Sequence, residues 1–323
     1  MKKWTIFSLM LLFSVATANA ASNTGTVAAQ FLKIGVGAQA AAMGGATTAH
    51  VNDPAALYWN VGALAHLNQP ALYGAHTEWF AGIQHDFIGL TLPIGANNIL
   101  GLSLIALTTG DIEQTTLSQQ DGTGIFYDVA DIALGISAAR QLTDRFSVGV
   151  TGKYVRQTVW NESAATFAFD IGALMITDLH GMRLGMQFSN LSGDLKLNGS
   201  DLLAGDGTQQ VTESYALPVR FQFGIALDVV GHNMPEAPHR LTVAIDGTHP
   251  GDGAETLHLG LEYAHKTWLF LRSGYVINHD TADVSFGGGV RWSLAQTPFQ
   301  LDYAYADLGL LDDVQRVSLK LNF

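Results

Sequence analysis

The sequence predicts an all-β protein: a 14-stranded antiparallel transmembrane β-barrel with a short amino-terminal plug that contains a small helix. Three observations predict it. Apolar side chains recur at every second position in segments of about ten residues, which is the periodicity of strands. The breaks between segments alternate between short and long, like the periplasmic turns and external loops of outer-membrane barrels. The face opposite the apolar one is dominated by Gly, Ala and Ser, whereas a solvated sheet carries Lys, Glu and Thr.

The composition is that of a folded protein without cysteine chemistry. The 323 residues are 48% hydrophobic and 14% charged, and 16 basic against 28 acidic residues give a net charge of −12. Disordered chains combine low hydrophobicity with high net charge, so disorder is excluded. Nucleic-acid-binding proteins have a basic footprint, which this chain lacks. The absence of cysteine excludes a disulfide scaffold and a cysteine-ligated metal site.

Residues 1–20 have the pattern of a secretory signal peptide. Lys2 and Lys3 precede an apolar run that ends in the cleavage pattern Ala18-Asn19-Ala20. We therefore expect a mature chain that begins near Ala21 and is exported across the inner membrane; if it is the predicted barrel, its destination is the outer membrane of a Gram-negative-type cell. No later run reaches the roughly 18 consecutive apolar residues of a spanning helix, so hydropathy alone leaves a soluble exported protein or a barrel.

The strand segments number 14, and bacterial barrels have an even number of strands. The breaks at 110–124 and 191–216 are long, and both follow odd-numbered strands. Most breaks after even-numbered strands are short; the exception is 230–238, which has nine residues where a short turn is expected. A secreted β-sandwich would alternate similarly, but the small-residue second face favours the barrel. We expect strands at residues 70–78, 84–94, 98–109, 125–141, 145–158, 164–177, 181–190, 217–229, 239–248, 256–265, 268–277, 282–294, 298–307 and 313–323.

Residues 21–69 lack strand periodicity and are expected to fill the lumen of a barrel built from residues 70–323. Asp53 and Pro54 suit the start of a helix, and Tyr58 and Trp59 disfavour the alternative of a loose periplasmic tail. A glycine inside a strand often marks the close approach of another backbone. Nine strands place a glycine on the inward face: Gly101, Gly135, Gly149, Gly172, Gly185, Gly224, Gly260, Gly274 and Gly287.

Several stretches carry a family resemblance. Phe31-Leu32-Lys33-Ile34-Gly35-Val36-Gly37-Ala38, Met43-Gly44-Gly45-Ala46 and Ala56-Leu57-Tyr58-Trp59-Asn60 resemble the amino-terminal signature of the PorV/PorQ family, and the likeness continues through Leu271–Tyr275 and Asp302–Asp307. The family usually has Arg where this chain has Gln39, and Asn-Pro-Ala-Gly-Leu where it has Asn60-Val61-Gly62-Ala63-Leu64. The resemblance implies a FadL-like barrel whose plug signature comprises Gly35, Gly37, Gly44, Gly45, Asp53, Pro54, Tyr58, Trp59 and Asn60.

Motifs that suggest enzyme or cofactor chemistry lack their structural context. The run Gly35–Ala40 matches G-x-G-x-x-A, yet no βαβ pattern follows it. The 11 histidines include no H-E-x-x-H pattern, and the Asp-Gly pairs lack calcium-loop spacing and are typical of turns. No Ser/His/acid set is recognisable. We expect no catalytic residue, no metal ion and no cofactor.

Eleven charged side chains fall on the predicted inward face. Opposite charges lie on neighbouring strands, for instance Asp170 and Arg183, and mutual neutralisation in a polar lumen is the favoured interpretation because an unpaired buried charge is costly. The alternatives are that such pairs hold the plug or line a conduit. The eleven are Asp131, Lys153, Asp170, Arg183, Arg220, Asp228, Asp246, Glu262, Arg272, Arg291 and Asp302.

The resemblance implies a role in type IX protein secretion, in which PorV-like barrels receive cargo through its carboxy-terminal domain and hand it to the surface attachment machinery. Loops 110–124 and 191–216 would carry recognition. The expected partners are outer-membrane lipid, secreted cargo and secretion-system components. The alternative is a FadL-like channel for hydrophobic small molecules, with the plug as gate. Gly287-Gly288-Gly289 would then provide a side exit, unless these glycines accommodate a bulky plug residue such as Trp59.

Overall fold

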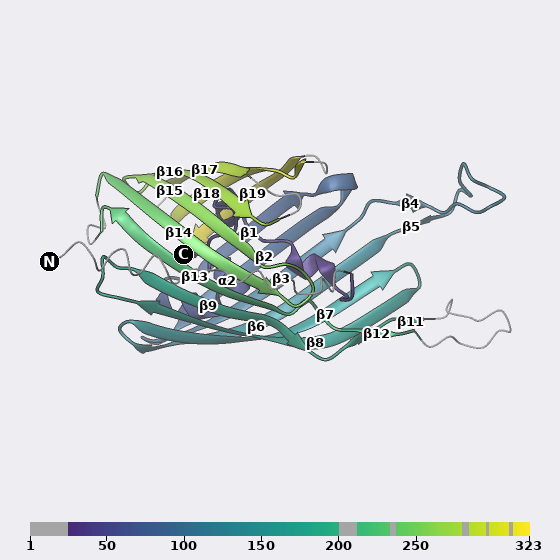
Figure 1. Cartoon of the computed structure of the whole chain (residues 1–323), viewed down its shortest axis with the longest axis horizontal. Coiled ribbons are helices and arrows are strands. Elements are labelled where there is room, and N and C mark those ends of the chain that lie inside the picture. The colour runs from purple at the N-terminus through teal and green to yellow at the C-terminus, as the bar shows by residue number, and fades with distance from the viewer. Residues whose placement is uncertain (1–24, 200–211, 233–236, 280–283, 295–296, 310–312) are drawn as a thin grey trace.

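A computed structural model describes residues 25–199, 212–232, 237–279, 284–294, 297–309 and 313–323. Its main feature is one closed antiparallel sheet (Figure 1). The sheet closes because β1 pairs with both β2 and β19, and β8 pairs with β9. Its long strands are β1 (Ala71–Glu78), β2 (Gln84–Ile94), β3 (Asn98–Thr108), β6 (Val129–Thr143), β7 (Phe146–Val159), β8 (Glu162–Ile176), β9 (Arg183–Ser192), β13 (Arg220–Val230), β14 (His239–Pro250), β15 (Thr256–His265), β16 (Leu269–Ile277), β17 (Val284–Leu294), β18 (Thr297–Asp307) and β19 (Asp313–Asn322).

These long strands correspond one to one to the 14 expected segments, so the predicted all-β barrel is confirmed. The expected signal peptide lies outside the described residues. No helix within the described ranges is long and apolar enough to cross a membrane.

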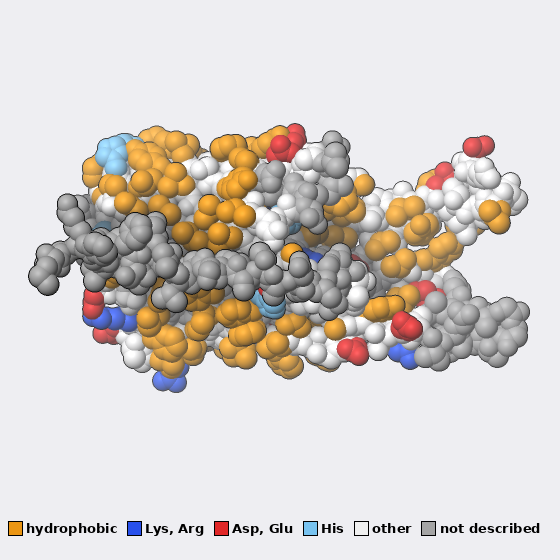
Figure 2. Space-filling model, in the orientation of Figure 1, with side chains coloured by type: hydrophobic (Ala, Val, Ile, Leu, Met, Phe, Trp, Pro, Cys, Tyr) orange, Lys and Arg blue, Asp and Glu red, His pale blue; other side chains and the backbone are white. Residues whose placement is uncertain are grey.

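The barrel wall is apolar outside and polar inside. In β6, Ile136 is 69% exposed, whereas the adjacent Ser137 is 1% exposed. Figure 2 shows the hydrophobic side chains spread over the outer wall. This is the reverse of a soluble protein, in which the apolar face of a sheet is buried. The outward face is therefore suited to lipid, as the alternation along each strand predicts.

The two ends of the barrel differ in the length of their connections. β4 (Ile112–Glu113) pairs with β5 (Phe126–Tyr127), and β10 (Leu195–Lys196) pairs with β12 (Ser214–Tyr215). Both small hairpins lie in the long breaks and project from the same end, at the right of Figure 1, while β11 (Asn198–Gly199) extends beside β8. Outer-membrane barrels carry their long loops outside the cell. We call this end the outer end and the opposite one the inner end.

The plug, residues 25–69, lies inside the barrel as a series of short helices. They are η2 (Gln30–Lys33), α1 (Ala38–Ala42), α2 (Ala56–Trp59) and η3 (Val61–His66); η4 (Phe80–Gly82) joins β1 to β2 outside the plug. The core of the protein lies where the plug meets the lumen wall. Its fully buried large side chains include Leu32, Met43 and Leu64 from the plug and Tyr73 and Phe87 from the wall.

Candidate functional site

The plug runs through the barrel from the outer end to the inner end. At the outer end, the backbone N–H of Ala28 donates to the carbonyl of Ala216 at 2.9 Å, and Lys33 Nζ lies 3.0 Å from Asp252 Oδ2 in the turn after β14. At the inner end, His66 Nε2 lies 3.1 Å from the Ser147 hydroxyl at the start of β7. The plug is thus attached to the wall at both ends.

The inward glycines are the places where the wall and the plug come closest. A β-carbon at Gly149 would lie 2.5 Å from the carbonyl oxygen of Val61, and one at Gly260 would lie 2.9 Å from the carbonyl oxygen of Met43. Both distances are shorter than β-carbons in protein structures keep from other atoms, so these two sites exclude a side chain. Of the nine glycines, Gly135 alone has only wall atoms nearest to it. The others lie against plug atoms: Gly101, Gly149, Gly172, Gly185, Gly224, Gly260, Gly274 and Gly287.

Asp53 and Pro54 form the turn before α2. The Asp53 carboxylate accepts the backbone N–H of Ala55 at 2.8 Å, and its carbonyl accepts the N–H of Ala56. The helix therefore begins at Ala56, two residues later than Pro54, because Pro54 and Ala55 belong to the turn. Burial raises the pKa of the Asp53 carboxyl, although the nearby Lys320 ammonium opposes this effect.

Tyr58, Trp59 and Asn60 connect parts of the plug that are distant in the chain. The Tyr58 hydroxyl donates to the carbonyl of Leu32 at 3.1 Å, and Trp59 Nε1 donates to the carbonyl of Val36 at 2.9 Å. Asn60 Nδ2 donates to the carbonyl of Thr48 at 2.7 Å. Together these bonds hold residues 58–60, at the end of α2, against the earlier part of the plug, residues 32–48.

Asn60 also joins the plug to the wall, since Nδ2 donates to the carbonyl of Ala173 in β8 at 3.0 Å. Its Oδ1 accepts the N–H of Gly62 at 3.0 Å and thereby caps η3. The side chain is fully buried and every one of these bonds goes to backbone. Asn60 is therefore a structural centre of the plug.

The four glycines of the plug signature lie at tight contacts. Gly35 packs beneath the Trp59 ring, where a β-carbon would lie 2.8 Å from Cζ2. Gly37 precedes α1 with φ of 85° and faces the Tyr73 hydroxyl. Gly44 and Gly45 have φ of 64° and 82°, and they lie against β16 and His258 respectively. Left-handed φ values favour glycine at the last three positions.

A buried ionic cluster connects the plug to four strands of the wall. Glu262 in β15 accepts Nε of Arg272 at 2.8 Å and Nη2 of Arg240 at 2.9 Å, and it lies 3.5 Å from His50 Nε2 of the plug. Arg272 also pairs with Asp302 at 2.6 Å. Buried charges need such pairing, because an isolated one is strongly destabilising.

Gln300 extends this cluster toward β17. Its Nε2 donates to Asp302 Oδ2 at 2.9 Å, and its Oε1 accepts Nη2 of Arg291 at 2.6 Å. Arg291 thereby joins the network through an amide instead of a carboxylate.

The expected pair of Asp170 and Arg183 does not form. Asp170 pairs with Lys153 at 2.8 Å, and Arg183 pairs with Asp228 at 2.8 Å. The register explains the error: Arg183 lies opposite Ile176, six residues along β8 from Asp170, and a register shift occurs between Phe169 and Ile171.

The remaining predicted lumen charges have other partners. Asp246 Oδ2 accepts the backbone N–H of Thr48 in the plug at 2.7 Å, and Asp131 accepts Nε2 of Gln157 at 2.8 Å. Arg220 donates to the Tyr58 hydroxyl at 3.1 Å, and its guanidinium lies 5.0 Å from the centre of that ring.

The Gly287-Gly288-Gly289 run opens no gap. β17 pairs with β16 and β18 through all three glycines without a register shift. A β-carbon at Gly287 would lie 2.6 Å from Ala42 Cβ, so α1 and not Trp59 occupies this space.

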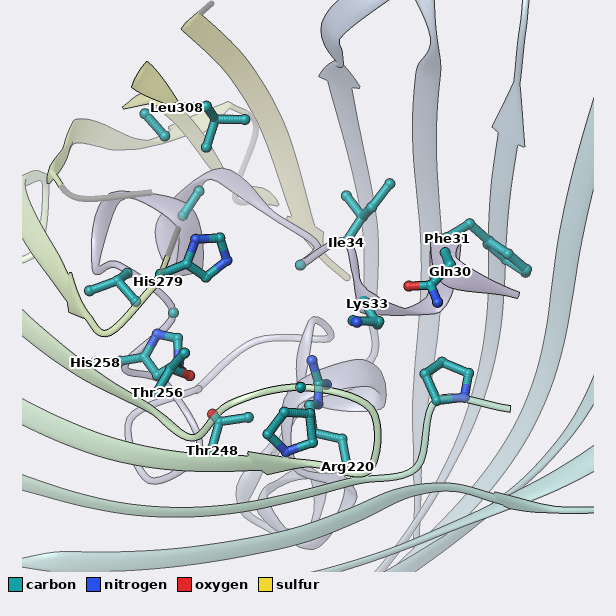
Figure 3. Close-up of a pocket in the computed structure, with 18 of the residues that line it drawn as sticks. Gln30, Phe31, Lys33, Ile34, Arg220, Thr248, Thr256, His258, His279 and Leu308 are labelled. Carbon is teal, nitrogen blue, oxygen red and sulfur yellow. Dashed lines mark hydrogen bonds between the residues drawn. The ribbon is translucent and has the colours of Figure 1, made fainter. Parts of the chain in front are cut away.

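A chamber of about 1070 Å³ lies above the plug at the outer end. Its floor includes Gly44, Gly45 and Trp59. Figure 3 shows Lys33 and Ile34 of the plug facing Arg220, Thr248 and His258 of the wall across this space. Its apolar lining includes Phe31, Ile34, Trp79, Phe80, Leu107 and Leu308. The chamber therefore offers both charged and apolar surface toward the outside.

Comparison with known proteins gives the family. The model of the type IX secretion system protein PorV matches residues 17–200, more than half of the chain. The chain belongs to the PorV family. It is thus an outer-membrane barrel of the type IX secretion system class. No curated protein sequence matches the chain.

Solved FadL-type structures share the fold of this PorV-family barrel. A Pseudomonas aeruginosa FadL homologue is 14% identical with a TM-score of 0.55, covering 90% of this chain and 98% of that one. The Pseudomonas putida toluene transporter TodX is 14% identical with a TM-score of 0.58, covering 89% and 96%. The monoaromatic hydrocarbon channel CymD is 14% identical with a TM-score of 0.58, covering 90% of this chain and 98% of that one. At this identity, the likeness concerns fold alone.

Sequence reasoning missed two residues that attach the plug of this PorV-family chain. His50 was not considered as a lumen charge, although it is the only ionisable side chain between Lys33 and Asp53 and thus stood out. Asp252 belongs to one of the Asp-Gly pairs that were interpreted as typical of turns, yet it binds Lys33. Its Asp-Gly pair gave no signal for that contact, because the partner is 219 residues away.

Proposed function

We propose that this PorV-family barrel is a receptor of type IX secretion: it receives a secreted cargo protein at its outer end and hands it to secretion-system components while the plug stays in the lumen. The observation that carries this proposal is the close contact of plug and wall at eight inward glycines. A plug fitted so closely is suited to remain in place. The work of the protein is then done at its outer surface.

The outer end supplies the surface that such a receptor needs. The two projecting hairpins, β4 with β5 and β10 with β12, and the outer chamber all lie at this end. The hairpin β4–β5 exposes Ile112, Ile125 and Phe126. Exposed apolar side chains on a polar loop are typical of protein-binding surfaces. We assign cargo recognition to the described parts of these two loops, residues 109–128, 193–199 and 212–219.

A second candidate function is the uptake of hydrophobic small molecules. It is supported by the aromatic and aliphatic lining of the chamber, with Phe31, Trp79 and Phe80 among its residues. Passage would require the plug to move, since it lies below the chamber.

Locking the plug separates the two functions. The chain has no cysteine, so an introduced pair can form only one bond. Val27, at the start of the plug, pairs with Ala216 in an isolated parallel bridge. Paired strand segments lie about 4.8 Å apart, within the roughly 4.4–6.8 Å that separates the α-carbons of a disulfide. The test is the double variant Val27→Cys with Ala216→Cys, in a strain with no other copy of the protein, with both single variants as controls.

The receptor function predicts that cargo reaches the cell surface equally well with the disulfide oxidised or reduced. Loss of surface cargo on oxidation, with recovery on reduction, would contradict it. The uptake function predicts that a labelled aromatic hydrocarbon enters only the reduced form. Copurification of cargo from intact outer membranes gives an independent measurement of the first function.

A further inference from the structure

A depression lies on the lipid-facing wall near the inner end, apart from the lumen. It has a volume of about 420 Å³ and crosses β2, β3, β6 and β7. Ala138 forms its floor, because the register sets this short side chain between Leu100 and Val150. Leu100 is 44% exposed and Val150 is 54% exposed, so both walls are apolar and face outward. We call this depression the wall groove.

An arginine closes one end of the wall groove. Arg140 is exposed on the outward face of β6 and lies in register with Asn98 and Val148. Within the described residues it has no ion pair, and no carboxylate lines the groove. The cation is therefore left for a partner from outside the chain.

The position of Arg140 along the strand indicates the depth of that partner. The strand ends at Thr143 and turns at Asp144, so Arg140 lies near the inner end of the barrel. An arginine on the lipid face is costly at the middle of a bilayer and much less so near its interfaces. The inner interface of an outer membrane carries the phosphate groups of phospholipids. A guanidinium binds phosphate with two parallel hydrogen bonds.

We propose that the wall groove binds one phospholipid of the inner leaflet, with an acyl chain over Ala138 and the phosphate on Arg140. The apolar groove and its single unpaired cation match the two parts of such a molecule. This site is separate from the outer chamber and does not depend on the proposed secretion function.

The test measures phospholipid binding to the purified full-length protein. The delipidated barrel in detergent is titrated with phosphatidylglycerol, and bound lipid is counted by native mass spectrometry. Arg140→Gln removes the cation and Ala138→Leu fills the groove. The matched control is Arg156→Gln, which removes an exposed arginine from β7 nearer the outer end. Lipid A, the anionic lipid of the other leaflet, is titrated in parallel.

We expect the wild-type protein and Arg156→Gln to retain one phosphatidylglycerol equally. Arg140→Gln should weaken retention about fivefold, the typical effect of one basic group at a membrane surface. Ala138→Leu should weaken it as well, with unchanged heat-modifiable gel migration as evidence of folding. Equal retention by Arg140→Gln and Arg156→Gln would overturn the proposal. So would tighter binding of lipid A than of phosphatidylglycerol.

Discussion

The backbone of Gly44 in the plug lies directly against the backbone of Gly274 in β16, with no side chain between them. A β-carbon at Gly44 would lie 2.9 Å from the backbone nitrogen of Tyr275, and one at Gly274 would overlap the nitrogen of Gly44. The nearest atoms are backbone, which cannot rotate away as a side chain can. The fit between plug and wall therefore depends on the absence of side chains at these two positions.

Replacing Gly274 with valine is expected to displace the plug. Valine is favourable in strands, so any effect of this substitution comes from the contact between the new side chain and the plug. Overpacking of a tightly packed interior costs about 1–3 kcal/mol. We expect Gly274→Val to raise ion conductance in planar bilayers. Gly247→Val in β14 is the control, since a β-carbon there meets nothing within 4 Å. Equal conductance of the two variants would show that the plug does not depend on this contact.

The fold was predictable because strand periodicity is a local property. Side chains alternate between the two faces of a strand, so Gly274 and Gly287 could be placed inward from their neighbours alone. Pairing across strands is different. It depends on register, which places Arg183 opposite Ile176, six residues from Asp170, so Asp170 pairs with Lys153 of β7 instead. The sequence pattern contained no sign of that register.

The interior of the plug was less predictable than the wall. Its hydrogen bonds are made by single side chains to distant backbone, such as Asn60 to Ala173 across 113 residues. No periodicity encodes such a contact. The family resemblance singled out Asn60, but only the structure gives it partners.

Glu262→Gln is expected to destabilise the barrel strongly. The substitution leaves the buried Arg272 and the half-buried Arg240 without a carboxylate they share. Breaking a buried ion pair from one side costs about 3–5 kcal/mol. The measurement is the temperature at which heat-modifiable gel migration is lost. Glu255→Gln is the control, because Glu255 pairs with His249 on the surface, where a pair contributes about 0–1 kcal/mol. Equal melting of both variants would contradict the role of the cluster.

Asn60→Ala should loosen the plug while leaving the barrel wall intact. It leaves the buried backbone groups of Thr48 and Gly62 without their partner, and each unsatisfied group costs about 1–3 kcal/mol. We expect faster protease cleavage within residues 25–69 with unchanged heat-modifiable migration. Asn278→Ala, at an exposed asparagine that bonds to the Glu255 carbonyl, should cleave at the wild-type rate. A wild-type cleavage rate for Asn60→Ala would refute this assignment.

Acid is expected to weaken the inner attachment of the plug through His66. Burial lowers the pKa of His66 below its ordinary value of 6.5, so the folded protein favours the neutral ring. The unfolded chain binds a proton to His66 more readily than the folded protein does. The neutral ring therefore contributes its full stabilisation to the folded state above pH 6.5, the pKa of the unfolded chain. This contribution is lost as the pH falls from 6.5 toward the lower pKa of the folded state. His66→Gln cannot titrate, yet it can still bond to the Ser147 hydroxyl. Protease cleavage after residue 60 should thus increase on acidification from about pH 7.5 to about pH 5.5 in the wild type, and increase less in His66→Gln. An identical pH response of the two proteins would assign the acid sensitivity to other groups.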